Sequence, residues 1–398
     1  MSGSLFSSRC RLRSFLASLF LLGATVALPA AGQSNSAQTG NGNATPTLSF
    51  GASTTALPNA LLAEVLKRDR VLFKNLQGSA LSFSSFEKGP EIVRSIRENK
   101  VDVAILGDFP TLEAAATANV LVLALVRQNF ATTVGPKGKT LAGMKGQRIG
   151  TAAGTSGVFT LLQGLENAGL TENDVKFVTL PISELTDALL SGRVDAVALF
   201  EPLPSAIIRK YPHRFSALHK QASSAYLVMN RSLMDNDPQA ATQITAALAR
   251  AVRWLRKDRA NLALAARWTL KAMMPFGGSE SLLTEQEIAR QTKATLLDLS
   301  DAPALPLNSA DKDALLGQEF AFMQRHGKLP ATAEWDKVAR SFHPQTMKSI
   351  LADPKKYRLD VFDYAHCAPP ATPATADRAG RQLLRGERRR ADRSARAT

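Results

Sequence analysis

Short apolar runs rich in β-branched residues alternate with helical patterns along most of the chain, which indicates an α/β protein with a largely parallel sheet. The predicted strands begin at Thr47, Ala80, Val101, Val120, Gln147, Val175, Val194 and Ala225. The helices predicted between them cover roughly residues 58–67, 90–98, 111–118, 157–168 and 182–191.

The pattern becomes wholly helical from Asp237 onward. In the segment "DPQAATQITAALARAVRWLRK", Asp237 is a suitable helix cap and Pro238 fits the first helical position. Ile244, Leu248 and Val252 fall on one helical face, which predicts that this long helix packs against the core.

Two segments of the chain repeat one another. The segments "NKVDVAILGDFP" and "GRVDAVALFEP" align without gaps, and Asp108 of the first falls on Glu201 of the second. Each has Val-Asp before an apolar strand and an acid shortly before a proline after it. The repeat predicts two similar α/β units that form two facing lobes, and a chance likeness between two strands is the alternative.

The first 32 residues have the features of a secretory signal peptide. Three arginines precede the run "FLASLFLLGATVA", which is too short to span a bilayer, and small residues follow. We predict cleavage before Gln33, followed by a polar linker over residues 33–46. An uncleaved membrane anchor is the alternative interpretation.

The net charge of +15 is concentrated at the two ends. The signal segment carries +3 and the arginine-rich stretch from Asp377 carries +5, so +7 remains on the body, and no nucleic-acid surface is required. Residues 366–398 are predicted to be a disordered basic tail, with attraction to an anionic membrane as the alternative. Removal of Cys10 with the signal leaves Cys367 alone, and an exported protein without an internal disulfide fits a bacterial periplasm.

A glycine-rich turn in "RIGTAAGTSGVFTLLQGLENAGL", residues 148–170, leads from a strand into a helix. It lacks the Lys-Ser/Thr pair of a nucleotide P-loop, the spacing of a dinucleotide fingerprint and the second glycine of a nucleophile elbow. Thr155, Ser156 and Gly157 would then offer hydroxyl and N–H groups to a small oxyanion at the helix start. An ordinary helix cap that binds nothing is the alternative.

Further candidate ligand contacts follow the other strands, because open α/β sheets bind ligands outside the carboxyl ends of their strands. These candidates are Ser53, Thr54, Gly89, Gly107, Asp108, Phe109, Gln128, Phe200 and Glu201. Helix caps and core positions are the alternative roles for them.

The sequence gives little support for catalysis. The histidines show no metal-ligand spacing, so neither a metal nor another cofactor is expected. Asp102 and Asp195 precede strands and are interpreted as turn residues. Asp108 and Glu201 could form a general acid–base pair, which keeps open an exported enzyme on the same two-lobed fold.

Three segments, taken in order along the chain, resemble the periplasmic solute-binding proteins of transporters for nitrate, taurine and aliphatic sulfonates. They are "FEKGPEIVRSIRENKVDVAILGDFPTLEAA", "VGPKGKTLAGMKGQRIGTAAGTSGVFTLLQGLENAGL" and "VDAVALFEP". The long helix from Asp237 is similar to the family's long helix, and the likeness covers roughly residues 47–357. Two positions depart from the family pattern: its "GDTP"-like turn reads "GDFP" here, and Phe200 replaces a frequent Trp.

The resemblance implies a type II periplasmic binding protein fold with a ligand cleft between two hinged lobes. The first lobe would hold residues 47–133 and 223–365, and the second lobe residues 134–222. The protein would be a monomeric, non-enzymatic component of an ABC importer that delivers a small solute to a membrane permease. A ligand-sensing domain is a further alternative.

The ligand itself stays open among nitrate, sulfonates, taurine and pyrimidine precursors. A desolvated carboxylate at Asp108 or Glu201 would repel a bare anion. We therefore expect an amino-sulfonate, or another oxyanion that carries an N–H donor, in preference to nitrate.

Overall fold

A computed structural model of the 398-residue chain describes residues 47–76, 78–276, 282–302, 305 and 315–365. The predicted signal peptide at 1–32, the linker at 33–46 and the basic tail at 366–398 lie outside these ranges.

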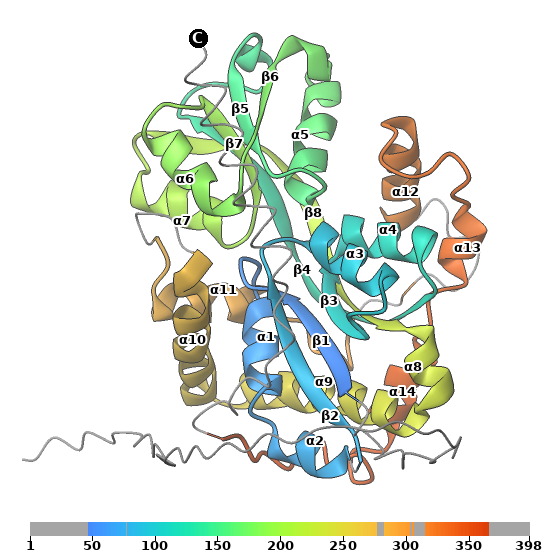
Figure 1. The fold of residues 1–398 in the computed structure, drawn as a ribbon. Helices are drawn as coiled ribbons and strands as arrows, with labels where there is room; N and C mark the ends of the chain where they lie inside the picture. Colours follow the sequence, from blue (N-terminus) through green and yellow to red (C-terminus); the bar gives the residue numbers. More distant parts are fainter. Residues whose placement is uncertain (1–46, 77, 277–281, 303–304, 306–314, 366–398) are drawn as a thin grey trace, which may run out of the picture. The chain divides into compact units, whose positions relative to one another are not determined.

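The strands of the described chain form one eight-stranded sheet in the order β2-β1-β3-β8-β4-β7-β5-β6 (Figure 1). Their bounds are β1 Thr47–Ser53, β2 Ala80–Phe86, β3 Val103–Gly107, β4 Val120–Pro136, β5 Arg148–Thr151, β6 Lys176–Thr179, β7 Ala196–Phe200 and β8 Phe215–Asn230. All eight predicted strands are confirmed, and seven of them begin within two residues of the predicted start.

The sheet contains two parallel triplets that are joined by two long antiparallel strands. Strands β2, β1 and β3 run parallel and lie in the predicted first lobe, whereas β7, β5 and β6 run parallel and lie in the predicted second lobe. Between them β8 pairs antiparallel with β3, and β4 pairs antiparallel with both β8 and β7. The prediction of parallel strands therefore holds within each lobe but not for the strands that connect the lobes.

Strands β4 and β8 are much longer than the sequence predicts, because the predicted strands cover only their apolar halves. Residues 127–136 and 215–224, in which polar and apolar side chains are mixed, continue the same ladder, because backbone hydrogen bonds between two strands do not require apolar side chains. The predicted lobe boundaries at 133/134 and 222/223 thus fall inside two paired strands rather than in loops.

The helices follow the strands in the predicted order. Their bounds are α1 Asn59–Leu66, α2 Arg70–Asn75, α3 Gly89–Arg97, α4 Asp108–Thr117, α5 Ser156–Asn167, α6 Ile182–Leu190, α7 Leu203–Lys210, α8 Arg231–Asn236, α9 Pro238–Lys257, α10 Arg259–Met273, α11 Glu285–Thr295, α12 Leu315–Arg325, α13 Trp335–Ala339 and α14 Gln345–Ala352. The five predicted interstrand helices are confirmed. Helix α4 begins three residues earlier than predicted, because Pro110 lies in its first turn, where a missing N–H group breaks no helical hydrogen bond.

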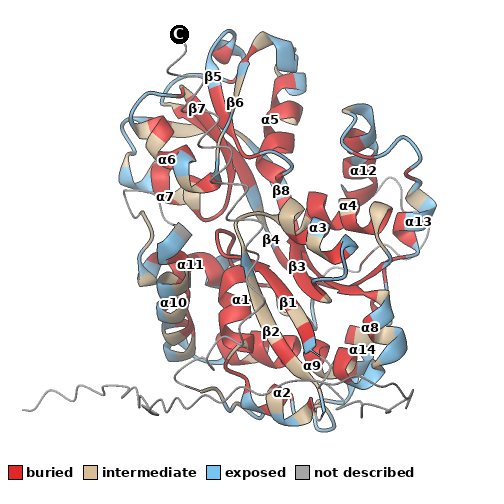
Figure 2. Cartoon of the chain, viewed as in Figure 1, coloured by how far each residue is buried: buried red, intermediate tan, exposed pale blue. Residues whose placement is uncertain are grey.

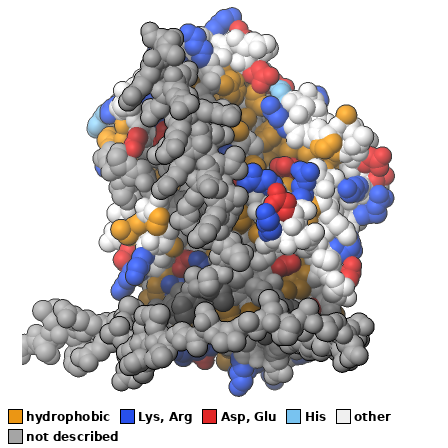
Figure 3. Space-filling view, viewed as in Figure 1, with side chains coloured by type: hydrophobic (Ala, Val, Ile, Leu, Met, Phe, Trp, Pro, Cys, Tyr) orange, Lys and Arg blue, Asp and Glu red, His pale blue; other side chains and the backbone are white. Residues whose placement is uncertain are grey.

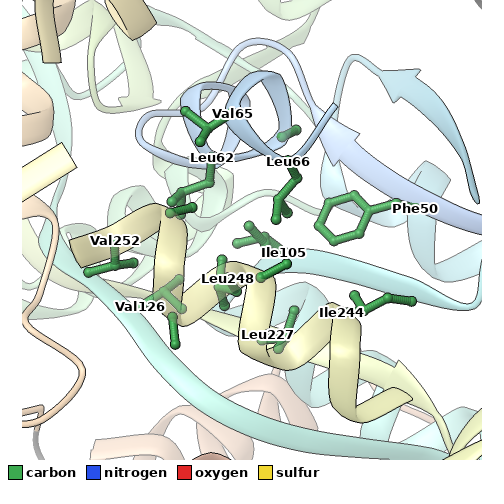
Figure 4. Close-up of a cluster of buried hydrophobic side chains, with 14 of the residues drawn as sticks. Phe50, Leu62, Val65, Leu66, Ile105, Val126, Leu227, Ile244, Leu248 and Val252 are labelled. Atoms are coloured by element: carbon green, nitrogen blue, oxygen red, sulfur yellow. The ribbon is translucent and has the colours of Figure 1, made fainter. Parts of the chain in front are cut away.

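The core of the first lobe lies between the sheet and helices α1 and α9. Figure 4 shows Leu62 and Leu66 of α1 and Leu248 of α9 among side chains from β1, β3, β4 and β8. Both helices are buried along most of their length (Figure 2). The Asp237 carboxylate accepts a hydrogen bond from the Ala240 N–H at 2.9 Å, which confirms the predicted cap of α9.

The two repeated segments occupy equivalent places in the two triplets. The Asp102 carboxylate accepts a 2.8 Å hydrogen bond from the Ser49 N–H of β1, and the Asp195 carboxylate accepts a 2.8 Å bond from the Arg148 N–H of β5. Each acid therefore ties the start of one parallel strand to the neighbouring strand. The interpretation of both residues as turn residues is confirmed.

The described part of the face drawn in Figure 3 shows no strong bias of charge. On the face drawn in Figure 3, lysine and arginine side chains mix with aspartate and glutamate side chains, most visibly over α3. Among the described residues, no helix combines the length and the apolar character that crossing a bilayer requires.

Candidate functional site

A pocket lies at the carboxyl ends of parallel strands from both lobes, where open α/β sheets bind their ligands. It has about 410 Å³ of empty space, part of which is open to solvent. Its lining residues are Ser53, Ala56, Asn59, Gly89, Ile105, Leu106, Gly107, Pro110, Arg127, Thr155, Ser156 and Phe200.

Four helices begin at this pocket, and their N-cap residues provide no side-chain acceptor, although the Phe109 N–H of α4 donates to the Asp108 carboxylate at 3.0 Å. Residues at the starts of α1, α3, α4 and α5 line the pocket, and none of these helices has a side-chain N-cap among the described residues. By contrast α2, α8, α9, α10 and α11 are capped by a side chain, and no residue of these helices lines the pocket. Helix N-termini carry partial positive charge, so the pocket favours an anion.

Arg127 places a guanidinium group at the pocket, although its side chain is only 2% exposed. Its Nη2 donates to the Ser224 carbonyl at 2.7 Å and to the Ser223 hydroxyl at 3.1 Å, and its Nη1 donates to the Leu57 carbonyl at 3.4 Å. Its Nε is buried and has no hydrogen-bond partner among the described residues. Burial lowers the pKa of Arg127 and the charge of Asp108 raises it, yet an arginine stays protonated.

A β-bulge aims Arg127 at the pocket. Leu125 pairs with Tyr226 and Arg127 pairs with Ala225, so Val126 is an extra residue on β4. Bulges of this kind redirect side chains at sites of function.

Asp108 balances the charge of Arg127, and the two side chains bind the N–H and the carbonyl of the same residue, Ser224. Its Oδ2 accepts from the Ser224 N–H at 3.0 Å, and its Oδ1 accepts from the Phe109 N–H at 3.0 Å. Burial raises the pKa of Asp108, while the Ser224 hydrogen bond and the Arg127 charge oppose this rise. The carboxylate is 1% exposed and does not line the pocket.

The glycine-rich turn brings the start of α5 against the second lobe's sheet. A Cβ on Gly157 would lie 2.5 Å from the Ala198 carbonyl oxygen of β7, so only glycine allows this approach. Gly154 has a φ of +73°, and a Cβ there would lie 2.7 Å from Pro90 of the first lobe. These two glycines therefore serve packing, whereas Thr155 and Ser156 line the pocket.

Comparison with known proteins identifies the family of this chain. The model of the NMT1-like family matches residues 47–270, which is more than half of the chain. The chain belongs to the NMT1-like family.

The relatives of this NMT1-like chain include a protein of Escherichia coli (strain K12) that is named for the binding of aliphatic sulfonates. The two are 28% identical over 154 residues, which cover 36% of this chain and 46% of the relative. The chain thus spans about half the length of this curated relative.

Solved structures show the same fold. The alkanesulfonate-binding protein of Xanthomonas axonopodis pv. citri, solved with MOPS bound, matches with a TM-score of 0.56 at 21% identity, covering 75% of this chain and 98% of that one. A desulfurization enzyme matches with a TM-score of 0.51 at 16% identity, covering 78% and 100%. At these identities the likeness shows the fold alone, which is the predicted two-lobed α/β fold of periplasmic binding proteins.

Six of the predicted site residues of this NMT1-like protein line the pocket: Ser53, Gly89, Gly107, Thr155, Ser156 and Phe200. The other six do not line it: Thr54, Asp108, Phe109, Gln128, Gly157 and Glu201.

The other six have identifiable partners or positions elsewhere. Phe109 stacks on Phe159 of α5 with ring centroids 3.5 Å apart, so it joins the two lobes. Thr54 donates from its hydroxyl to the Phe86 carbonyl at 3.2 Å. Gln128 is exposed, and the prediction that the strand ends there was wrong, because the ladder with β8 continues to Pro136.

Glu201 directly follows the lining residue Phe200, at the start of the segment that leads to α7. Its Oε1 accepts from the Ser205 hydroxyl at 2.8 Å, and its Oε2 is buried without a partner among the described residues. Burial raises the pKa of this carboxyl, and the Ser205 hydrogen bond opposes that rise.

The sequence reasoning missed Arg127 and Asn59, the pocket's cation and its side-chain amide. The sequence did contain a signal for Arg127 as a site residue, because a charged residue directly follows the apolar run "VLVLALV" of a buried strand. For Asn59 the sequence contained no such signal beyond the position of this residue at a helix start. Within the described ranges, no cluster of three or more His, Cys, Asp or Glu side chains could hold a metal ion.

Proposed function

We propose that the protein is the periplasmic substrate-binding component of an ABC importer and that it captures a small solute with an oxyanion group. The observation that carries this proposal is the buried guanidinium of Arg127, whose Nε–H has no partner among the described residues and which lines the pocket. A buried donor without a partner is costly, and an anionic oxygen of a ligand would supply the missing acceptor.

The electrostatics of the pocket support an anion over a cation. Arg127 is the ionisable residue among those that line the pocket, and no acid is among them. The N-termini of α1, α3 and α5 add partial positive charge at the same place, whereas α4 begins with the Asp108 carboxylate. The Ser53 and Thr155 hydroxyls already donate to the Glu87 carbonyl at 2.9 Å and the Ala152 carbonyl at 2.8 Å, so the Ser156 hydroxyl is the neutral side-chain donor that we expect to serve the ligand.

A sulfonate is the ligand class that fits best. Its three oxygens offer several acceptors to donors that converge from both lobes, and the apolar side chains of Ile105, Leu106 and Phe200 can contact a short carbon chain. The Escherichia coli relative, which is named for aliphatic sulfonates, supports the same class.

We infer that the ligand is bound and released without chemical change. The two acids considered for catalysis, Asp108 and Glu201, do not line the pocket, and the Asp108 oxygens accept backbone N–H groups. A bound solute would then be passed to a membrane permease by a monomeric, cofactor-free protein. The predicted signal peptide, cleaved before Gln33, would deliver that protein to the periplasm.

Calorimetry with ethanesulfonate tests this proposal on the mature protein. The Arg127→Lys variant keeps the charge but loses the planar fork of donors, so its affinity should fall about 10- to 100-fold, as expected for a hydrogen bond to a charged group. The exposed Arg193→Lys variant is the matched control and should bind like wild type.

Equal affinity in wild type and Arg127→Lys would refute the role of this side chain in binding. A changed ligand in the NMR spectrum after long incubation with the protein would instead show an enzyme.

A further inference from the structure

Asn59 presents a second buried group that lacks a partner at the same pocket. Its side chain is 2% exposed and lines the pocket from the first residue of α1. The amide Nδ2 donates to the Ile105 carbonyl at 3.3 Å, whereas Oδ1 has no hydrogen-bond partner among the described residues.

The orientation of this amide is fixed by its surroundings. The Ile105 carbonyl can only accept a hydrogen bond, so the nitrogen of Asn59 must face it and the oxygen must point elsewhere. Oδ1 is therefore an acceptor that requires a donor, and a buried acceptor without a donor is unfavourable.

Arg127 and Asn59 are close in the fold. Arg127 Nη1 donates to the carbonyl of Leu57, two residues before Asn59. The pocket thus combines an unpaired donor, Arg127 Nε, with an unpaired acceptor, Asn59 Oδ1. A ligand that satisfies both has an anionic oxygen and a hydrogen-bond donor.

The charge of the pocket decides which donor is preferred. An ammonium group would meet the Arg127 guanidinium and the N-termini of α1, α3 and α5, and no lining residue is an acid. A hydroxyl donates to Asn59 Oδ1 without adding positive charge.

We propose that Asn59 is a specificity-determining residue and that it selects small anions bearing a neutral donor, such as hydroxyalkanesulfonates, over both unsubstituted and amino-substituted ones. This inference rests on the proposed function and deepens it. It replaces the expectation that an acid meets an amino group of the ligand.

A matched ligand series tests the inference by calorimetry at pH 7. The probes are 2-hydroxyethanesulfonate, ethanesulfonate and 2-aminoethanesulfonate, which differ in one substituent. In wild type the hydroxy compound should bind about tenfold tighter than ethanesulfonate, the effect of one hydrogen bond to a buried acceptor, and the amino compound weakest.

The Asn59→Leu variant keeps the branching and the number of heavy atoms of the side chain, and it removes the Oδ1 acceptor together with the Nδ2 donor. Its preference for the hydroxy compound over ethanesulfonate should disappear, while the exposed control Asn167→Leu should keep the wild-type ratio. The wild-type series needs no variant, so it decides the question even if Asn59→Leu fails to fold.

The outcomes separate the two proposals. Equal binding of all three probes in wild type, tightest binding of the amino compound, or an unchanged ratio in Asn59→Leu would overturn the role of Asn59 and leave the sulfonate site standing. Binding of none of the three would overturn the proposed function and this inference together.

Discussion

Glu319 is the residue whose burial is hardest to reconcile with its charge. It lies on α12 at 4% exposure, and neither carboxyl oxygen has a hydrogen-bond partner among the described residues. Burial raises the pKa of Glu319 well above its ordinary value, and the charge of Asp108 raises it further. Burial therefore extends to higher pH the range over which this carboxyl stays protonated, and its α12 neighbours Leu316, Phe320 and Met323 belong to an apolar cluster.

We expect the Glu319→Met variant to be more stable than wild type by about 1–3 kcal/mol at pH 8, because it removes a buried polar group without partners. The folded-state pKa of Glu319 lies above its unfolded-state value of about 4.5, so the unfolded chain binds fewer protons between the two. Wild-type stability should then fall as pH rises above about 4.5, and the advantage of the variant should grow from pH 5 to pH 8.

Urea unfolding across this pH range measures the effect. The exposed Glu172→Met variant is the control and should follow the wild-type pH profile. A constant difference between Glu319→Met and wild type at every pH would mean that Glu319 does not titrate as proposed.

Helix α6 takes its N-terminal cap from the other lobe. It has no side-chain cap at its own N-cap residue, Pro181, but Oε1 of Glu87 accepts from the Ser183 N–H at 3.1 Å and from its hydroxyl at 3.4 Å. The Glu87 carbonyl in turn accepts from the hydroxyls of Ser53 at 2.9 Å and Thr55 at 2.7 Å. A pocket residue, Ser53, is thus linked through Glu87 to a helix of the second lobe.

We expect the Glu87→Ala variant to weaken ethanesulfonate binding about fivefold, because the closed arrangement loses a charge–helix contact of about 1 kcal/mol. Calorimetry measures the affinity. If the lobes part without ligand, urea unfolding of the ligand-free variant should show a change in unfolding free energy that is much smaller than the change in binding free energy. The exposed Glu172→Ala variant should retain wild-type affinity. A stability loss as large as the affinity loss would place the contact in the ligand-free form as well.

At the scale of the whole molecule, the segment before Ala365 secures α2 to α9. Asp69 and Arg250 form a fully buried ion pair with Nη2 and Oδ2 2.8 Å apart, and Tyr364 forms a β-bridge with Asp69. The Tyr364 ring also packs against Trp254 of α9, with centroids 4.5 Å apart. Burial raises the pKa of Asp69, and the charge of Arg250 opposes that rise.

We expect a chain that stops at Tyr357 to lose at least about 2–4 kcal/mol of stability, because the buried ion pair becomes accessible to water and the Trp254 contact is lost. The matched control is a chain that stops at Ala365, which removes only the predicted basic tail and should melt within about 2 °C of the full mature chain. Thermal unfolding of both distinguishes the two segments. A large drop in the melting temperature of the chain that stops at Ala365 would show that residues 366–398 contribute to stability.

The sequence alone determined the order and type of the elements and half of the predicted pocket contacts. Strands such as β3 and β7 carry continuous buried apolar residues, and helix α9 carries a regular apolar face with a capping acid, so local periodicity was sufficient. Thr155 and Ser156 could be placed at the pocket because a helix start after a parallel strand has only one place in such a sheet.

The tertiary structure decided which polar side chains reach the pocket. Gln128 and Arg127 are neighbours in sequence, and only the bulge at Val126 turns Arg127 inward and leaves Gln128 exposed. The long halves of β4 and β8 in which polar and apolar side chains are mixed likewise became strands because they pair with one another, which no local pattern reveals.

The same holds for Asp108 and Asn59, whose roles depend on groups far away in the sequence. The Asp108 carboxylate turns to the Ser224 N–H rather than to a ligand, and the Ile105 carbonyl fixes the Asn59 amide so that its oxygen is left without a donor. Residue identity in the sequence sets what a side chain can bind, whereas the direction in which it points depends on contacts between distant segments that form only in the folded chain.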